Sequence, residues 1–90
     1  MTLADAAEKV YLALGHEPYI TSLLMKPSGV YGSAAGILVD SRVPEAPGQT
    51  QLWWLSYETI VDLDEPALAA GYRMMLRRAR RTLGEARDRP

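Results

Sequence analysis

The 90-residue sequence contains no cysteine, a single histidine and no long apolar run. The lack of cysteine excludes disulfides and thiolate metal sites. No apolar run approaches the roughly 20 residues that a membrane-spanning helix needs, so we expect no membrane segment. Met1 is not followed by a basic segment, an apolar run and a small-residue cleavage site. We therefore expect a cytoplasmic protein that does not act at a membrane.

Few side chains are suited to catalysis or to metal binding. His16 is the only residue of a type that titrates near neutrality. Helix capping already accounts for the acids at three further positions, Asp62, Asp64 and Glu65, so they do not indicate catalysis. One histidine and scattered carboxylates match no recognised spacing of metal ligands. We expect no enzyme activity, no cofactor and no metal.

The segment LALGHEPYITSLL, which contains His16, resembles the Gly-His-Glu-Pro segment of histidine phosphatases of the phosphohistidine-phosphatase type. The resemblance implies that a strand leads to Gly15 and that His16 lies in a phosphate pocket. That family also requires an upstream Arg-His-Gly motif that carries the nucleophilic histidine. This chain has no second histidine, so the resemblance covers about a dozen residues and lacks the nucleophile.

Three glycines, Gly29, Gly32 and Gly36, suggest a phosphate-binding loop, because backbone N–H groups without side chains can hold an anion. Their spacing matches neither common phosphate-loop motif. A better interpretation is that Gly32, Ala34 and Gly36 lie on one strand face, where they let a helix or a partner approach closely. A small enzyme or ligand-binding module centred on His16 and this strand is our third interpretation of the function.

Length and composition are those of one small globular domain over residues 1–90, with 48% hydrophobic and 23% charged residues. The charge is uneven, because residues 1–65 carry nine acids and three bases whereas residues 66–90 carry two acids and seven bases. The molecule is therefore a charge dipole. Eight of the ten basic residues are arginine, and alanine is abundant, which indicates a GC-rich bacterial or phage genome.

The apolar periodicity predicts an α+β fold in the order helix, short helix, strand, strand, helix. The first helix begins at a capping box made by Thr2 and Asp5 and is apolar at every third or fourth residue up to Leu14. A short second helix is expected over residues 19–25, and it ends before Pro27. Residues 10–14 can instead be interpreted as a strand, which gives the alternative order β-α-β-β-α.

Residues 30–40 and 51–61 predict an antiparallel hairpin joined by a loop that contains proline and glycine. On the second strand, Trp53 and Tyr57 point to one face and Trp54 points to the other. Both faces then need cover, either from helices on both sides or from a second molecule. We therefore expect a homodimer and place Trp53, Trp54 and Tyr57 in a partner-binding surface.

The last predicted helix begins at residues 64–66, where two acids and a proline favour a helix start. One stripe of this helix is apolar and is expected to pack, and another arc is rich in arginine. We expect the arginine arc and a neighbouring methionine to bind an acidic protein surface or the phosphates of a nucleic acid. The expected packing stripe is Leu68, Tyr72, Met75, Ala79, Leu83 and Ala86, which fall in one arc with Leu76. The expected partner-binding residues are Arg73, Met74, Arg77, Arg80 and Arg81.

Taken together, these features favour a small non-enzymatic cytoplasmic binding protein. We expect a regulator or stoichiometric inhibitor of the type that phages and mobile elements carry, acting by protein–protein interaction. The second interpretation is a nucleic-acid-binding regulator that uses the arginine-rich helix.

Overall fold

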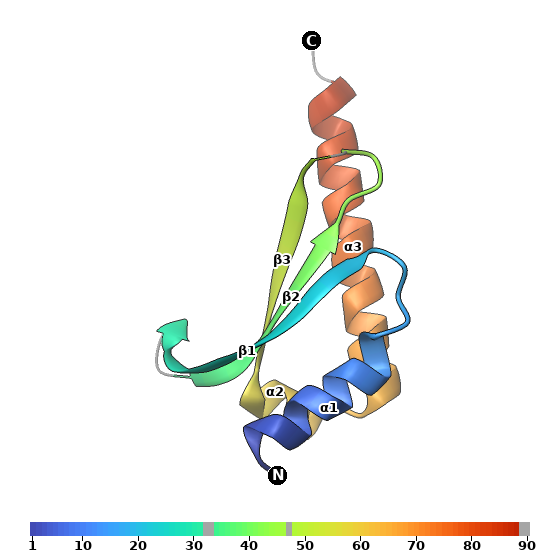
Figure 1. Cartoon of the computed structure of the whole chain (residues 1–90). Helices are drawn as coiled ribbons and strands as arrows, with labels where there is room; N and C mark the ends of the chain where they lie inside the picture. Colours follow the sequence, from blue (N-terminus) through green and yellow to red (C-terminus); the bar gives the residue numbers. More distant parts are fainter. Residues whose placement is uncertain (32–33, 47, 89–90) are drawn as a thin grey trace.

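The computed structural model describes residues 1–31, 34–46 and 48–88. In chain order, its elements are α1 (Leu3–Leu14), β1 (Ile20–Tyr31), β2 (Ala34–Arg42), β3 (Thr50–Ser56), α2 (Tyr57–Asp62) and α3 (Glu65–Asp88). The strands form one antiparallel sheet in the order β1-β2-β3 (Figure 1). The predicted α+β class and the predicted hairpin are confirmed, whereas the order of the elements differs from both predicted orders.

The helix predicted over residues 19–25 is wrong, because residues 20–25 form the first half of β1. A residue that precedes proline is forced toward an extended conformation, which ends a helix but suits a strand. Pro27 has no backbone N–H to donate, and an edge strand tolerates this loss. The β-branched Ile20 and Thr21 also favour the extended chain. The strand therefore runs through the proline to Tyr31.

The strand predicted over residues 30–40 is displaced toward the C-terminus. Its first two residues end β1, and β2 begins at Ala34 and continues to Arg42. Gly32 and Ser33, which the predicted glycine-rich strand included, lie outside the described residues.

The strand predicted over residues 51–61 is divided between β3 and α2. Ser56 ends the strand and caps the helix, because its Oγ accepts a hydrogen bond from the Thr59 amide at 3.3 Å. A serine at this position satisfies an amide that the first helical turn leaves free. Tyr57 is therefore the first residue of a helix, and the prediction that it shares a strand face with Trp53 is wrong.

Helix α1 confirms the predicted N-terminal helix and excludes the strand alternative for residues 10–14. The Thr2 amide donates to Asp5 Oδ2 at 2.9 Å, and the Asp5 amide donates to Thr2 Oγ1 at 3.1 Å. The hydrogen bond from the Thr2 amide, together with the Thr2 side chain, holds the pKa of the Asp5 carboxyl below its ordinary value. At the other side of α1, Lys9 Nζ donates to the Ile60 carbonyl at 2.6 Å and so joins α1 to α2.

The helices pack on one face of the sheet and enclose the core (Figure 1). On this face, the sheet contributes alternate residues of β2 together with Leu55 of β3. Leu68, Tyr72 and Leu76 are the buried residues of α3, close to the predicted stripe. The buried core consists of Ala6, Val10, Ala13, Leu14, Ile37, Val39, Leu55, Ile60, Leu68, Tyr72 and Leu76.

Helix α3 is the longest element, with 24 residues, which corresponds to about 36 Å. It starts near the end of β3, runs back along the sheet and projects beyond the β2–β3 connection (Figure 1). Among the side chains that the structure describes, the buried core residues of α3 all lie in its first half. The rest of the helix is therefore available to line surfaces outside the core.

Candidate functional site

The face of the sheet opposite the core has no helix over it within the described residues (Figure 1). Leu24, Leu38 and Trp54 are direct neighbours across the three strands and form one row on this face. Leu24 is 44% exposed, and Leu52 beside the row is 52% exposed. We call this surface the outer face, and it consists of Ser22, Leu24, Lys26, Gly36, Leu38, Asp40, Leu52, Trp54 and Ser56.

The indole of Trp54 lies over Gly36. A Cβ added at Gly36 would be 2.7 Å from Cζ2 and 2.8 Å from Cη2 of Trp54, so the ring occupies the space that a side chain would fill. Sequence analysis expected a helix or a partner to approach the small residues of this strand, whereas at Gly36 the close approach is made by the Trp54 side chain of the neighbouring strand. Trp54 is half-buried although no described helix covers it.

Asp40 brings a buried polar atom to the outer face. Its Oδ1 is buried and has no hydrogen-bond partner among the described residues. Ser22 and Leu52 are its neighbours across the strands. A buried acceptor without a partner costs about 1–3 kcal/mol. The outer face therefore combines apolar side chains with one unsatisfied acceptor.

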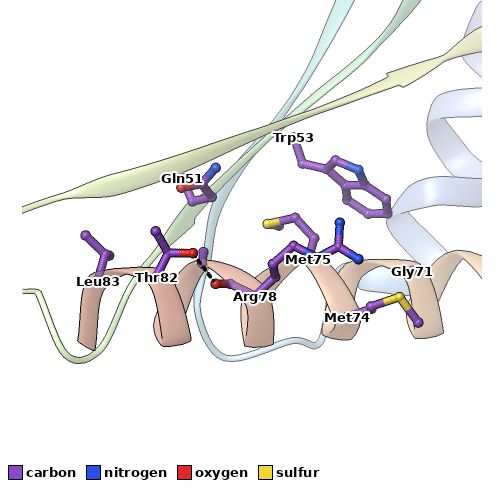
Figure 2. A pocket seen from close by; sticks show the side chains of 9 residues that line it. Gln51, Trp53, Gly71, Met74, Met75, Arg78, Thr82 and Leu83 are labelled. Atoms are coloured by element: carbon purple, nitrogen blue, oxygen red, sulfur yellow. Dashed lines mark hydrogen bonds between the residues drawn. The ribbon is translucent and has the colours of Figure 1, made fainter. Parts of the chain in front are cut away.

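A groove of about 540 Å³ lies between β3 and α3 (Figure 2). Trp53 forms its β3 side, and its ring centroid is 6.2 Å from that of Tyr72 in the core. Figure 2 shows Arg78 and Met75 pointing from α3 toward the strand. Gly71 forms the floor, where an added Cβ would be 3.3 Å from Trp53 Cη2. The groove is lined by Gln51, Trp53, Gly71, Met74, Met75, Arg78, Ala79, Thr82 and Leu83.

The arginines of α3 divide into two kinds. Arg73 Nη2 lies 3.0 Å from Glu17 Oε1, and Arg80 Nε donates to both carboxylate oxygens of Glu45 at 2.8 and 2.9 Å. The hydrogen bonds that Arg80 donates to Glu45 raise the pKa of Arg80 above its ordinary value. Within the described part of the chain, Arg77, Arg78 and Arg81 form no ion pair. The charge available to a ligand is therefore smaller than the number of arginines suggests.

The predicted partner-binding residues do not form a single site. Trp53 and Met74 both line the groove, whereas Trp54 lies on the outer face. Tyr57 belongs to α2, and its hydroxyl donates to the Met1 carbonyl. The remaining predicted residues lie along α3 outside the groove: Arg73, Arg77, Arg80 and Arg81.

Sequence reasoning missed several residues of these surfaces. Leu24 and Leu52 are the exposed large apolar residues of the outer face among the described side chains, and Arg78 lines the groove. Leu24 could be assigned to a face only if residues 19–25 were interpreted as a strand. The β-branched pair Ile20 and Thr21 was the signal in the sequence for that assignment.

His16 is exposed and follows helix α1, whereas the phosphatase resemblance implies a strand before it. Among the described residues, no group of three or more histidine, aspartate and glutamate side chains is placed to hold a metal ion. No described helix is both long enough and apolar enough to cross a membrane.

No protein-family model, curated protein or solved structure matches this chain. The surfaces described above are therefore the basis for a functional assignment.

Proposed function

We propose that the chain is a non-enzymatic cytoplasmic regulator or stoichiometric inhibitor of bacterial or phage origin that binds a protein on its outer face. The observation that carries the proposal is the row of Leu24, Leu38 and Trp54, on a sheet face that no described helix covers. An antiparallel sheet with one solvated face normally places polar side chains there. Here the centre of that face is apolar.

The composition of the outer face supports a protein partner. Leu24 and Leu52 are exposed on the two edge strands, Trp54 is half-buried, and Leu38 between them is only 8% exposed. Apolar side chains that meet across three strands form a connected apolar surface, and such a surface marks an interaction site. A half-buried tryptophan beside leucines is typical of the central residues that dominate binding energy. Ser22, Lys26 and Ser56 surround this centre, as the polar rim of a protein interface does.

Asp40 supports the same proposal. Its unsatisfied Oδ1 lies on the face that we assign to the partner. Because Oδ1 is buried in the free chain, a partner reaches it only if Asp40 or its neighbours change rotamer, and a donor supplied in this way would remove the penalty of an unpaired acceptor. A residue that lowers the stability of the free protein is expected where binding requires it.

Nucleic-acid binding through α3 is the second candidate function. Its support is that Arg77, Arg78 and Arg81 form no ion pair among the described residues. Each could contact a phosphate by a charge-assisted hydrogen bond. The pairing of Arg73 and Arg80 with acids of the chain itself makes this candidate the weaker one.

The proposal is tested by using the tagged chain as bait in an extract of the cells that naturally make it, with and without nuclease. We expect a stoichiometric protein partner that survives nuclease treatment. Leu24→Lys and Leu52→Lys should lose this partner, because each places a charge in the apolar row or beside it. The matched control is Leu12→Lys, since Leu12 is 60% exposed on α1, away from the sheet.

Circular dichroism and thermal unfolding are used to check that all three variants fold. Equal capture by Leu24→Lys, Leu12→Lys and the unchanged chain would contradict the proposal. Loss of the captured protein on nuclease treatment would favour the second candidate.

A further inference from the structure

We propose that β3 pairs in antiparallel fashion with β3 of a second copy of this chain, so that two three-stranded sheets join and the two grooves face each other. The inference rests on the proposed function in one respect. The joined sheets place two outer faces side by side, and the proposed partner binds there.

The two edge strands of the sheet, β1 and β3, differ in whether they are protected against pairing with a strand of another chain. Edge β1 contains Lys26 and Pro27, and its register shifts twice, between Ile20 and Ser22 and between Lys26 and Tyr31. Charge, proline and irregular register are the features that keep an edge strand from joining another chain. Edge β1 is therefore protected.

Edge β3 has none of these features. All seven of its residues, from Thr50 to Ser56, pair with β2 in unbroken register, and none is charged or proline. Because alternate residues of an edge strand direct their N–H and C=O groups outward, the side of β3 away from β2 presents a regular row of backbone groups. This side is suited to accept another strand.

The groove beside this edge supplies side chains for the same contact. Trp53, Met75 and Leu83 line it, and Met74 at its α3 side is 59% exposed. A two-fold axis through the β3 edge places these residues against the equivalent groove of the second copy. The pairing thus covers apolar area in addition to forming backbone hydrogen bonds.

The area is sufficient for a specific contact. Strand β3 is about 24 Å long, and the strand and helix layers together are about 20 Å deep. The contact covers roughly 500 Å² on each copy, or about 1,000 Å² in total, which is the lower limit expected for a biological interface.

The charge distribution favours the antiparallel arrangement. Residues 1–65 carry nine acids and three bases, and residues 66–90 carry two acids and seven bases. The two-fold axis turns the second α3 antiparallel to the first, so its basic half runs toward the end of the molecule that holds α2. Glu58 and Asp62 of α2 are exposed there. Arg78 and Arg81 of the second copy then approach acids rather than bases.

The test is sedimentation equilibrium of the full chain between about 1 and 100 micromolar. We expect a mass twice the 9.9 kDa of one chain at the upper end. Met74→Lys should return the mass to 9.9 kDa, because the two-fold axis brings like charges to both sides of the contact. The control Leu12→Lys, at a residue of equal exposure, should remain a dimer.

Hydrogen exchange supplies a second measurement. In the unchanged chain, the β3 amides should exchange more slowly at high than at low protein concentration. In Met74→Lys, their exchange rate should be the same at both concentrations. A mass of 9.9 kDa at every concentration overturns the inference. A dimer that Leu24→Lys dissociates and Met74→Lys does not would show that the outer face joins the copies, which also overturns it.

The two proposals fail separately. A monomer whose partner capture depends on Leu24 removes the dimer and leaves the proposed function. A dimer that captures no Leu24-dependent partner supports the β3 contact and removes the proposed function.

Discussion

At the scale of single residues, the core contains one feature that titrates. Ser41 Oγ and Tyr72 Oη lie 2.6 Å apart in a buried hydrogen bond, and both residues are 0% exposed. Burial raises the pKa of Tyr72 above its ordinary value of 10.0, the Ser41 hydrogen bond lowers it in part, and the charge of Glu17 raises it further. The folded protein therefore keeps the Tyr72 proton at pH values where the unfolded chain loses it.

This pKa shift predicts a loss of stability in base. The contribution is complete below about pH 10 and is lost as the pH rises through the folded pKa, because the unfolded chain then binds fewer protons. Tyr72→Phe should cost about 1 kcal/mol at neutral pH and should reduce the decline at high pH. Urea unfolding from about pH 8 to about pH 11 measures both effects. The control is Tyr11→Phe, whose ring is 67% exposed, and an identical decline in both variants would contradict the prediction.

Two glycines predict opposite effects of one added methyl group. Gly36→Ala should destabilise the protein by about 1 to 3 kcal/mol, because the new Cβ meets the Trp54 ring and the Leu55 carbonyl. Gly84→Ala should stabilise it by about 0.5 to 1 kcal/mol, since nothing lies within 4 Å of that position and alanine favours the helix. Chemical denaturation of both variants is the measurement. A stability of Gly36→Ala equal to that of the unchanged chain would show that Trp54 moves aside at little cost.

At the scale of elements, the first and last helices were predicted, whereas strand β1 and the short helix α2 were not. The capping box of Thr2 and Asp5 and the acids before α3 are local signals, and the structure confirms both helix starts. Strand β1 forms through pairing with β2, which a local sequence pattern does not report. Pro27 forces the residue before it toward an extended conformation. This effect was interpreted as the end of a helix, whereas in the structure it is compatible with the continuation of β1.

The candidate site was predicted only in part for the same reason. Trp53 and Trp54 were assigned to opposite faces from the strand period alone, and this assignment is confirmed. Tyr57 was placed with Trp53 because Ser56 was not recognised as a helix cap. Leu24 was missed because its face depends on the register of β1 with β2.

For helix α3, we predict that nucleic-acid binding is absent or weak. Arg73 and Arg80 are paired with Glu17 and Glu45, so Arg77, Arg78 and Arg81 are the arginines without an ion pair among the described side chains of the helix. Three phosphate contacts on duplex DNA would give roughly a fortyfold loss of affinity between 50 and 200 mM salt. Titration of generic duplex and single-stranded nucleic acids at both salt concentrations should show no such dependence.

Two sets of variants distinguish the arginines that form no ion pair from those that pair with acids of the chain. If binding occurs, replacing Arg77, Arg78 and Arg81 by glutamate should abolish it. Replacing Arg73 and Arg80 should have the smaller effect, because their charges already meet carboxylates. A tight, steeply salt-dependent complex that requires Arg77, Arg78 and Arg81 would make nucleic-acid binding the leading function.

At the scale of the whole molecule, two features combine. The helices cover one face of the sheet and leave the other without a described helix, and the charges of the chain separate into an acidic body and a basic last helix. A chain of this size buries only about 60 to 65% of its unfolded surface, so further burial on association is favourable. The outer face and the β3 edge are separate surfaces, and a second copy at the edge leaves Leu24 on the far strand uncovered.

The central claim is that a protein partner covers the outer face. The chain has no cysteine, so Leu24→Cys introduces one thiol on this face, and Leu12→Cys introduces one at an exposed position on α1. The rate of maleimide labelling is measured for each purified variant and again in a desalted extract of the cells that naturally make the chain. We predict that the extract slows labelling of Leu24→Cys and leaves that of Leu12→Cys unchanged. Equal rates for Leu24→Cys in the purified protein and in the extract would contradict the claim.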